Sequence, residues 1–423
     1  MKKTTAKINE FLRGISMHPD QTDLRSATHE FISELEKGLR GENSSLKMIP
    51  TYISAYGTPT DDIPVIAIDA GGTNLRTSLV TFENGKPVIS RMEVNPIPGS
   101  LSEISANEFF NQIADKVLPL TEVSDRIGFC FSYPAEIFPD RDGKILRLSK
   151  GVFVRDSVGL VIGRELMKKL CEKGTDKEFN FALLNDTVAS MMGGAAEFPI
   201  TGFDGICGLI LGTGFNTCYM EKGARITKLE SAPDMIINCE SGNFSKVLRG
   251  KPDDMTDLAS ENPGIGLFEK MISGAYLGKV ITNTAILASR EGMLSKEFSD
   301  IEALSLPELD EFLRGGGNGI ARLCKGEDSA VLKEIIDKCF ERAAKLACVN
   351  IAALCLQCDG GKTAERPFCV VAEGSTFYKS LLMRGKIEAY VREYIEGVLL
   401  RHVVFRGAAN LTLTGAALSA LIN

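Results

Sequence analysis

The sequence predicts an α/β protein built from two related domains, because strand-length apolar runs alternate with helical ones along the chain. Two predicted strands enter a glycine turn and double back as second strands. They occupy residues 65–80 (VIAIDAGGTNLRTSLV) and 207–220 (CGLILGTGFNTCYM). An offset of 142 residues aligns these hairpins and matches Ile68 to Ile210, Gly72 to Gly214 and Asn74 to Asn216. This offset is too long for a solenoid repeat and suits two copies of one α/β domain, with chance similarity as the alternative.

The length and composition are those of a globular enzyme. At 423 residues the chain exceeds one ordinary hydrophobic core, so two or three domains are expected. Hydrophobic residues make up 44% of the chain and charged residues 24%, as in soluble enzymes. The net charge of -7, with no basic stripe, argues against a nucleic-acid partner. The longest apolar runs are strand-length, so no membrane span is expected.

The N-terminal segment and the cysteines favour a cytoplasmic location. Residues 1–16 (MKKTTAKINEFLRGIS) have no continuous apolar core and no small-residue cleavage site, so no secretory signal is expected. The eleven cysteines are then expected to stay reduced. Cys355 and Cys358 form a C-x-x-C pair without a second pair or a nearby histidine, which favours a buried helix face over a zinc site.

The first predicted element is a helix over residues 22–39. Its apolar residues recur at helical spacing, and Thr22 is available as the N-cap. Residues 59–64 (PTDDIP) are rich in turn formers and predict a connector into the first hairpin.

Two further strands are predicted before the second hairpin. Residues 127–133 (IGFCFSY) form a short apolar and aromatic run that Pro134 ends. Residues 179–185 (FNFALLN) are again strand-like, and Asp186 follows them before a helical run from Thr187.

The second half is predicted to be mostly helical. Asn262 can cap a helix with Pro263 at its first position. Residues 285–350 are predicted to be mainly helical and carry no assignable motif. Residues 368–372 (FCVVA) predict a last buried strand, and residues 373–376 (EGST) open a helix.

The turn of the first hairpin has the chemistry of a phosphate site. Gly71 and Gly72 lack side chains, so backbone N–H groups can approach an anion closely. Asp69 could hold Mg²⁺ through water. Further donors are Thr73, Asn74 and Arg76. An ordinary hairpin turn is the alternative, so the surrounding motifs decide.

Eight motifs occur in order along the chain. They are 46–53 (LKMIPTYI), 69–76 (DAGGTNLR), 131–134 (FSYP), 148–151 (LSKG), 184–189 (LNDTVA), 212–221 (GTGFNTCYME), 238–240 (NCE) and 268–278 (FEKMISGAYLG). This series resembles the hexokinase family in its eukaryotic-type branch, with a single catalytic unit. The resemblance is dense from Leu46 to Gly278 and thinner afterwards.

The resemblance implies two actin-like lobes, each on a ribonuclease H-like sheet, around a central cleft. The small lobe would comprise residues 62–185 with 411–423, and the large lobe residues 1–61 with 186–410. The implied reaction is ATP-dependent, Mg²⁺-requiring phosphorylation of a hexose 6-hydroxyl, the first step of glycolysis. Glucose is the expected hexose, with mannose or fructose as alternatives, and a monomer or homodimer is expected.

The resemblance also assigns roles to residues. Asp186 would accept the proton of the 6-hydroxyl, while Arg76 and Lys150 would neutralise charge on the transferring phosphoryl group. Ser149 and Lys150 match the family's Thr-Lys pair that contacts the sugar. The implied sugar-binding residues are Ser132, Ser149, Lys150, Asn185, Asp186, Asn216, Glu240 and Glu269. Their carboxylates, amides and hydroxyls suit a polyol.

The implied nucleotide site combines both hairpins with the C-terminal region. Its residues are Asp69, Gly71, Gly72, Thr73, Asn74, Arg76, Thr213, Gly374, Ser375, Thr376, Thr414 and Gly415. Residues 411–417 (LTLTGAA) depart from the family's Gly-Ser-Gly-Lys-Gly-Ala-Ala, since the first glycines and the lysine are absent. The base-binding end is therefore less well matched than the sugar end. Leu148 also replaces the family's aromatic residue, and the chain has no Trp.

Two alternatives belong to other classes. A non-catalytic sugar sensor on the same fold should lose Asp186, Lys150 or the phosphate turns, all of which are present. The changed segment 411–417 keeps this alternative open. Another actin-like ATPase, such as a chaperone or acetate kinase, would share the hairpins but lack the Ser-Lys, Asn-Asp and Asn-Cys-Glu motifs.

Overall fold

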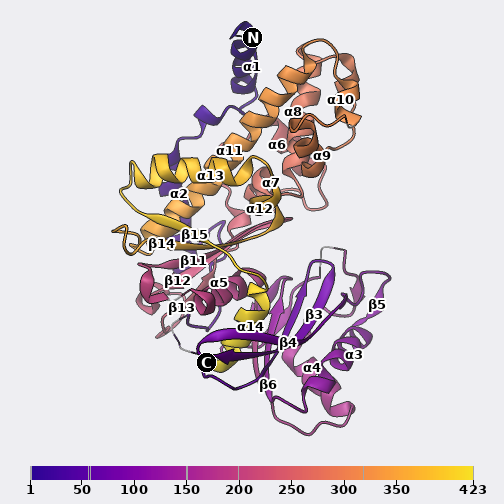
Figure 1. Ribbon diagram of the computed structural model, residues 1–423, viewed down its shortest axis with the longest axis vertical. Helices are drawn as coiled ribbons and strands as arrows, with labels where there is room; N and C mark the ends of the chain where they lie inside the picture. Colours follow the sequence, from indigo (N-terminus) through magenta and orange to yellow (C-terminus); the bar gives the residue numbers. More distant parts are fainter. Residues whose placement is uncertain are drawn as a thin grey trace.

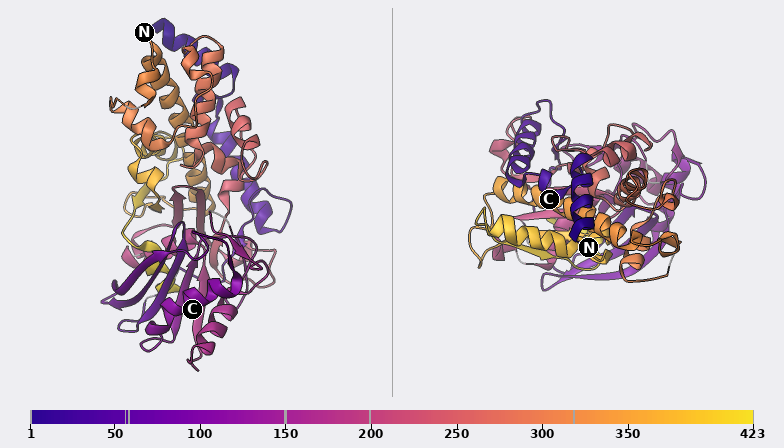
Figure 2. Two further views of the ribbon diagram at one scale, coloured as in Figure 1. Left: turned by 90° about the vertical axis from the view of Figure 1, so that its right-hand side faces the viewer. Right: turned by 90° about the horizontal axis from the view of Figure 1, so that it is seen from above.

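The computed structural model describes residues 2–55, 57, 59–148, 151–198, 200–317 and 319–422. Two β-sheets lie one above the other along the long axis (Figure 1). Most helices surround the upper, six-stranded sheet, and the lower, five-stranded sheet carries two helices of its own. The N-terminus lies at the helical end and the C-terminus beside the lower sheet (Figure 2).

The five-stranded sheet has the strand order β10-β6-β2-β3-β4. Its strands β2, β3 and β4 are antiparallel neighbours, whereas β6 and β10 run parallel to β2. The bounds are β2 Val65–Gly71, β3 Asn74–Glu83, β4 Lys86–Pro96, β6 Arg126–Phe131 and β10 Asn180–Leu184.

The six-stranded sheet has the order β1-β13-β12-β11-β14-β15 and repeats this pattern. Strands β11, β12 and β13 are antiparallel, and β14 and β15 run parallel to β11. The bounds are β1 Ile49–Pro50, β11 Ile206–Leu211, β12 Phe215–Glu221, β13 Met235–Asn238, β14 Phe368–Glu373 and β15 Val403–Arg406. Apart from the short edge strand β1, the sheets match strand for strand, which confirms the predicted duplication.

The two hairpins differ in their turns. Gly71 pairs with Asn74 across the turn residues Gly72 and Thr73. In the second hairpin Leu211 pairs with Phe215 across a turn longer by one residue. A single offset of 142 residues therefore cannot match both strands of the hairpins, and the sequence alignment is shifted near the turn.

The helices fall into three groups (Figure 1). Around the upper sheet lie α1 Lys2–Gly14, α2 Leu24–Leu39, α6 Lys251–Leu258, α7 Leu267–Ile272, α8 Leu277–Arg290, α9 Leu306–Leu313, α10 Gly319–Leu323, α11 Asp328–Gln357, α12 Ser375–Lys379 and α13 Met383–Tyr390. The lower sheet carries α3 Ala106–Val117 and α4 Ile162–Glu172. Between the sheets lie α5 Asp186–Glu197 and α14 Leu411–Ile422. Two small sheets pair β5 Ile104–Ser105 with β9 Val154–Arg155, and β7 Ala135–Ile137 with β8 Gly143–Ile145.

Two predicted helix starts are wrong. The N-cap of α2 is Asp23 rather than Thr22, because the Asp23 side chain accepts a 2.6 Å hydrogen bond from the Ser26 N–H. Helix α7 begins at Leu267, not at Pro263, since the segment after Asn262 forms a turn instead. In both places a local hydrogen bond outweighs the cap signal in the sequence.

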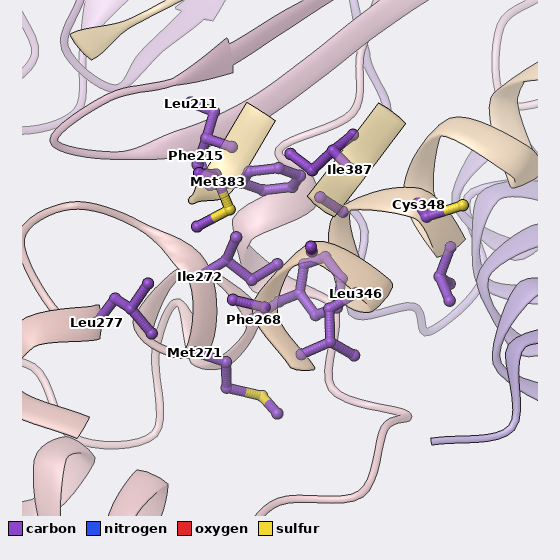
Figure 3. Close-up of a cluster of buried hydrophobic side chains, with 14 of the residues drawn as sticks. Leu211, Phe215, Phe268, Met271, Ile272, Leu277, Leu346, Cys348, Met383 and Ile387 are labelled. Carbon is purple, nitrogen blue, oxygen red and sulfur yellow. The ribbon is translucent and has the colours of Figure 1, made fainter. Parts of the chain in front are cut away.

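The hydrophobic core has three parts. One lies between the upper sheet and its helices, and Figure 3 shows Phe268, Leu346 and Met383 within it. A second lies between the lower sheet and α3 and α4. The third joins the two sheets around α5 and α14. A Cβ on Gly415 of α14 would lie 1.8 Å from the carbonyl oxygen of Ala189 on α5, so the two helix backbones touch.

None of the helices in the described part of the chain is long and apolar enough to cross a membrane. Cys355 is buried near the end of α11, and Cys358 directly follows this helix, half-buried.

Candidate active site

Asp186 lies where the chain leaves the lower sheet and enters α5. Strand β10 ends at Leu184, and Asn185 caps the helix by accepting a 2.9 Å hydrogen bond from the Thr187 N–H. Asp186 is the first helical residue, and its Oδ1 accepts bonds from the N–H and the hydroxyl of Thr187 at 2.8 and 3.2 Å. The half-buried carboxylate is thus held at the boundary between the two sheets.

A chain of amide hydrogen bonds leads away from this point. The Asn216 Nδ2 donates to Asn238 Oδ1 at 2.8 Å and to Asn185 Oδ1 at 3.5 Å. Asn238 Nδ2 in turn donates to Glu240 Oε1 at 2.9 Å. The Asn216 Oδ1 accepts from the Ser241 N–H at 3.1 Å. The structure therefore brings three predicted sugar-binding residues into one network.

Asn238 links this network but is absent from the residues assigned by resemblance. It is 5% exposed and sits at the end of β13. Its position in the Asn-Cys-Glu motif, two residues before the predicted Glu240, was the feature of the sequence that could have identified it.

A pocket opens beside the network. Asn185, Asn238 and Glu240 supply its polar wall. The remaining lining is Lys47, Ile49, Thr51, Phe131, Tyr133, Pro134, Ala135, Ile137, Leu146, Leu183 and Leu184. A few polar groups that converge on an apolar concavity are typical of a small-molecule site.

Glu269 lies beside the second turn. Its Oε2 accepts a 2.9 Å hydrogen bond from the Phe215 N–H, next to Asn216. A Cβ on Gly214 would lie 2.8 Å from the same oxygen, so a larger residue there would displace the Glu269 carboxylate. The second hairpin therefore fixes Glu269 on the side of the site that carries Asn216.

Ser132 is buried directly after β6, between two residues that line the pocket, Phe131 and Tyr133. Its N–H donates to the Ala70 carbonyl at 3.1 Å, beside the first turn. The predicted residues Ser149 and Lys150 lie outside the described residues, so their roles stay predictions.

Asp69 and Arg76 form an ion pair at the base of the first turn. Arg76 Nε donates to Asp69 Oδ2 at 3.1 Å, and Arg76 Nη2 donates to the same oxygen. Burial alone would lower the pKa of Arg76, but the charge and hydrogen bond of Asp69 raise it above its usual value. The turn residues Gly72, Thr73 and Asn74 are exposed.

The C-terminal helix completes this cluster. Thr412 donates to Asp69 Oδ2 at 2.8 Å and accepts from Arg76 Nη2 at 2.9 Å. The Arg76 Nη1 also reaches Asn410 Oδ1 at 3.4 Å. Thr412 is not among the site residues implied by the resemblance, because only the fold brings α14 to the first turn.

Glu373, at the end of β14, is a third carboxylate in this region. Its Oε2 accepts a hydrogen bond from the hydroxyl of Ser190 on α5. Burial and the neighbouring charges of Asp186 and Asp69 raise the pKa of Glu373, against the opposing effects of Ser190 and Arg76. The two turn regions and the start of α5 therefore share one electrostatic environment. The only sequence signal for Glu373 was its place before the predicted Gly374.

The backbone of the second turn, residues 212–214, is fixed by hydrogen bonds from two other segments. Gly212 O accepts from the Gly274 N–H and from the Thr376 hydroxyl, both at 2.8 Å. Thr213 and Ser375 are exposed, and Gly374 has a φ of 118°. Thr376 is 4% exposed and its hydroxyl is bonded to the turn, and its predicted contact with the nucleotide stays a prediction.

The predicted nucleotide contacts of Thr414 and Gly415 also stay predictions, and both residues lie inside the fold. Thr414 is 1% exposed, and Gly415 packs against Ala189 on α5. Both residues belong to the interface between the two central helices. Thr412, two positions earlier, is the residue of this segment that reaches the first turn.

A larger cavity, of about 540 Å³, lies elsewhere, at the ends of β11 and β12 remote from the turn. Its lining includes Ile206, Met220, Arg225 and Cys358 and none of the predicted site residues. The chemistry of the lining, rather than volume, therefore identifies the candidate site.

Comparison with known proteins decides the family. Two models described as hexokinase match consecutive parts of the chain, residues 7–196 and residues 206–422. The chain belongs to the hexokinase family. Human Hexokinase-3 is 29% identical to this chain, and the match covers 88% of this chain and 42% of the human protein. The match to rat Hexokinase-3 covers 39% of the rat protein. The chain thus spans about two-fifths of these mammalian relatives. Rice Hexokinase-3 is 28% identical over the whole chain and 91% of its own length.

Solved hexokinase structures share the fold. The Schistosoma mansoni hexokinase complexed with glucose aligns over 99% of both chains, with a TM-score of 0.77 and 23% identity. A second hexokinase crystal structure gives a TM-score of 0.80 and 22% identity, over 98% of this chain and 99% of its own. The predicted fold class, two actin-like lobes, is confirmed.

Proposed function

We propose that this member of the hexokinase family phosphorylates the 6-hydroxyl of a hexose, with ATP as donor and glucose as the preferred sugar. One observation carries the proposal: Asp186 lies at one end of the hydrogen-bonded chain formed by Asn185, Asn216, Asn238 and Glu240. Amides and carboxylates in series offer donors and acceptors to several hydroxyls at once. Leaving any of them unpaired is costly, which lets such a pocket reject a poorer sugar.

Asp186 is proposed as the general base. Thr187 holds the Asp186 carboxylate through two hydrogen bonds, so the carboxylate is oriented before a sugar arrives. It would orient the 6-hydroxyl and accept its proton as the bond to phosphorus forms. Glu240, Glu269, Ser132 and the neighbouring amides would bind the other hydroxyls, together with Ser149 and Lys150.

The two turns are proposed to hold the phosphates from opposite sides. Backbone N–H groups at Gly71, Gly72 and Thr73 would face Thr213 across the nucleotide. Arg76 stays charged beside Asp69 and would stabilise the charge that spreads over the transferring phosphoryl group, with Lys150. Further nucleotide contacts are assigned to Asn74, Gly374, Ser375, Thr376, Thr414 and Gly415.

Mg²⁺ fits this site as a hydrated ion. Among the described residues no group of three or more His, Cys, Asp or Glu is close enough to enclose a metal. Asp69 would therefore hold the ion through water, and oxygen ligands of this kind suit Mg²⁺. Bound there, the ion would neutralise charge on the nucleotide phosphates.

The lobes are assigned as residues 62–185 with 411–423, and residues 1–61 with 186–410. The lower sheet falls wholly in the first lobe, and α14 packs on its strands β2, β6 and β10. Closure of these lobes would exclude water and limit wasteful hydrolysis of ATP. A place in glycolysis, a cytoplasmic location and a monomer or homodimer stay predictions.

The proposal is tested by a coupled kinase assay across sugars and donors. Glucose, mannose, fructose and glucosamine are each combined with ATP, GTP and pyrophosphate, and turnover with glucose and ATP is expected to be highest. No turnover across the whole grid would contradict the proposal.

A sugar sensor on the same fold remains the second candidate because of α14. Leu411 and Leu413 are buried at its start, and no lysine faces the first turn from it. Calorimetric binding of glucose without turnover by any donor would favour the sensor.

A further inference from the structure

Helix α7 carries two neighbouring charged residues with different surroundings. Glu269 faces the site and accepts a hydrogen bond from the Phe215 N–H. Lys270 is only 2% exposed and turns to the other side, toward the loop that joins α6 to α7. The apolar side chains of this helix, Phe268, Met271 and Ile272, belong to the core cluster drawn in Figure 3. The rotation of α7 about its axis therefore decides whether Glu269 points at the site.

The Lys270 ammonium uses all its donors on the end of α6 and the loop that follows it. Nζ donates to Asp257 Oδ1 at 2.7 Å, to Ser260 Oγ at 2.8 Å and to the Asn262 carbonyl at 2.8 Å. A lysine ammonium has three N–H groups, so the set is complete. A buried cation is tolerated only when it is fully partnered, so these contacts fix the position of the side chain.

The loop has few other internal supports. The Asp257 carboxylate accepts from the Gly264 N–H at 3.1 Å, and the Ser260 hydroxyl donates to the Asp257 carbonyl at 2.6 Å. Burial would raise the pKa of Asp257, but the bonds from Lys270 and Gly264 hold it below its usual value. Leu258 is 76% exposed and Ile265 is 49% exposed, so the outer side of the loop packs on little.

We propose that Lys270 is a positioning residue for sugar binding, which holds α7 so that Glu269 faces the site. This inference rests on the proposed function, because it gives Glu269 its role in binding the sugar. Helix α7 spans only Leu267–Ile272 and has no side-chain cap at its start. So short a helix is oriented by its tertiary contacts: its apolar side chains anchor it in the core, and the three bonds from Lys270 fix its opposite side.

The test compares Lys270→Met with a matched control. The variant is expected to raise the KM for the sugar by about 10-fold or more, because a small displacement of a binding group is costly. The KM for the nucleotide should change much less than the KM for the sugar, since the second turn keeps its bonds to Gly274 and Thr376. The control is Arg342→Met, which breaks the equally buried pair of Arg342 with Asp253, on the same helix as Asp257. It should lower the melting temperature without changing the KM for the sugar.

A double variant separates position from stability. Lys270→Met combined with Asp257→Leu leaves neither charge unpaired, so the melting temperature should recover relative to Lys270→Met alone. The KM for the sugar should stay raised, because the contacts with Ser260 and Asn262 are still missing. Recovery of a normal KM together with stability would overturn the proposal.

A crystal structure of Lys270→Met gives a readout that needs no turnover. The Glu269 carboxylate is expected to leave the Phe215 N–H. Retention of that bond at its present length would overturn the inference, whether or not any sugar is phosphorylated. If the bond is lost while the unsubstituted protein phosphorylates no sugar, the positioning role stands and the proposed activity fails.

Discussion

Thr412 donates a 2.8 Å hydrogen bond to Asp69, a residue 343 positions earlier in the chain. The same hydroxyl accepts from Arg76, which is paired with Asp69, so the three side chains form a closed group at the base of the first turn. Thr412 stands where the related motif has its serine, so the departure in residues 411–417 keeps a hydroxyl at this point. The C-terminal helix thereby supports the first turn through the Thr412 side chain and not through glycine N–H groups.

Thr412→Val should weaken nucleotide binding. The Asp69 carboxylate is buried and would lose one of its donors, at a cost of about 1–3 kcal/mol. If about 1.4 kcal/mol of this cost is expressed in nucleotide binding, the KM for ATP rises about 10-fold. The KM for the sugar should stay unchanged, because the amide network lies apart from α14. Steady-state kinetics with each substrate varied in turn measure both values. Thr412→Ser retains the hydroxyl and is the control; equal losses in Ser and Val would contradict the explanation.

Asp186→Ala should lower kcat by at least about 10²-fold, the usual contribution of a general base, while sugar affinity stays nearly intact. The fold should survive, because Asn185 still caps α5 by accepting from the Thr187 N–H. Turnover by coupled assay and sugar affinity by calorimetry are measured on the same preparation. Near-normal turnover would remove Asp186 from the role of base.

Much of the fold could be predicted because its signals are local. Glycine turns, strand-length apolar runs and the repeated hairpin indicate two related α/β lobes, and both sheets have that form. The errors are also local. The N-cap of α2 is Asp23 and not Thr22, and α7 starts later than predicted. Both outcomes depend on which of several neighbouring polar groups finds a hydrogen-bond partner.

The placement of residues in the candidate site was predictable where the motif supplies both the side chain and its backbone position, as at Asp186 and Asn216, whose roles stay predictions. It was not predictable where long-range packing decides. Helix α14 buries Thr414 and brings Thr412 to the first turn, and Glu373 reaches the site only because β14 lies beside β11. A sequence pattern cannot say which face of a helix is turned toward a site formed by residues hundreds of positions away.

The stability of the protein should depend on pH through Glu34, which is 2% exposed on α2. Burial alone would raise its pKa, but Lys37 and Ser45 hydrogen-bond the carboxylate and lower the pKa from 4.5 to about 2. Since the pKa is lower in the folded state, the stabilisation, on the order of 3 kcal/mol, is complete above pH 4.5. It is lost as the pH falls from there through about 2.

Glu34→Gln should therefore reduce the free energy of unfolding at neutral pH, with a difference from the unsubstituted protein that shrinks as the pH falls below 4.5. Urea denaturation at a series of pH values measures it. The control is Glu36→Gln on the same helix. The Glu36 side chain is 52% exposed, and its carboxylate lies 3.9 Å from Arg40, which makes it a weak ion pair. A difference that stays constant from neutral pH into acid would show that Glu34 does not titrate as expected.

Gly415→Ala should destabilise the protein and disturb the nucleotide site together. The new Cβ would lie 1.8 Å from the Ala189 carbonyl oxygen. This oxygen belongs to the backbone of α5, so it cannot rotate out of the way as the end of a flexible side chain could. Overpacking of this kind costs about 1–3 kcal/mol or more. Any shift of α14 that relieves the clash also moves Thr412 away from Asp69, so the KM for ATP should rise as well.

The matched control for Gly415→Ala is Gly385→Ala. Gly385 is exposed within α13 and has no positive φ, and a Cβ added to it would meet no heavy atom within 4 Å. Alanine there should stabilise the protein by about 0.5–1 kcal/mol through the lower backbone entropy of the unfolded chain, and should leave both KM values unchanged. Urea denaturation and steady-state kinetics on both variants give the comparison. If Gly415→Ala had as little effect as Gly385→Ala, α14 would not pack closely on α5. The position of α14 would then not be what holds Thr412 against Asp69.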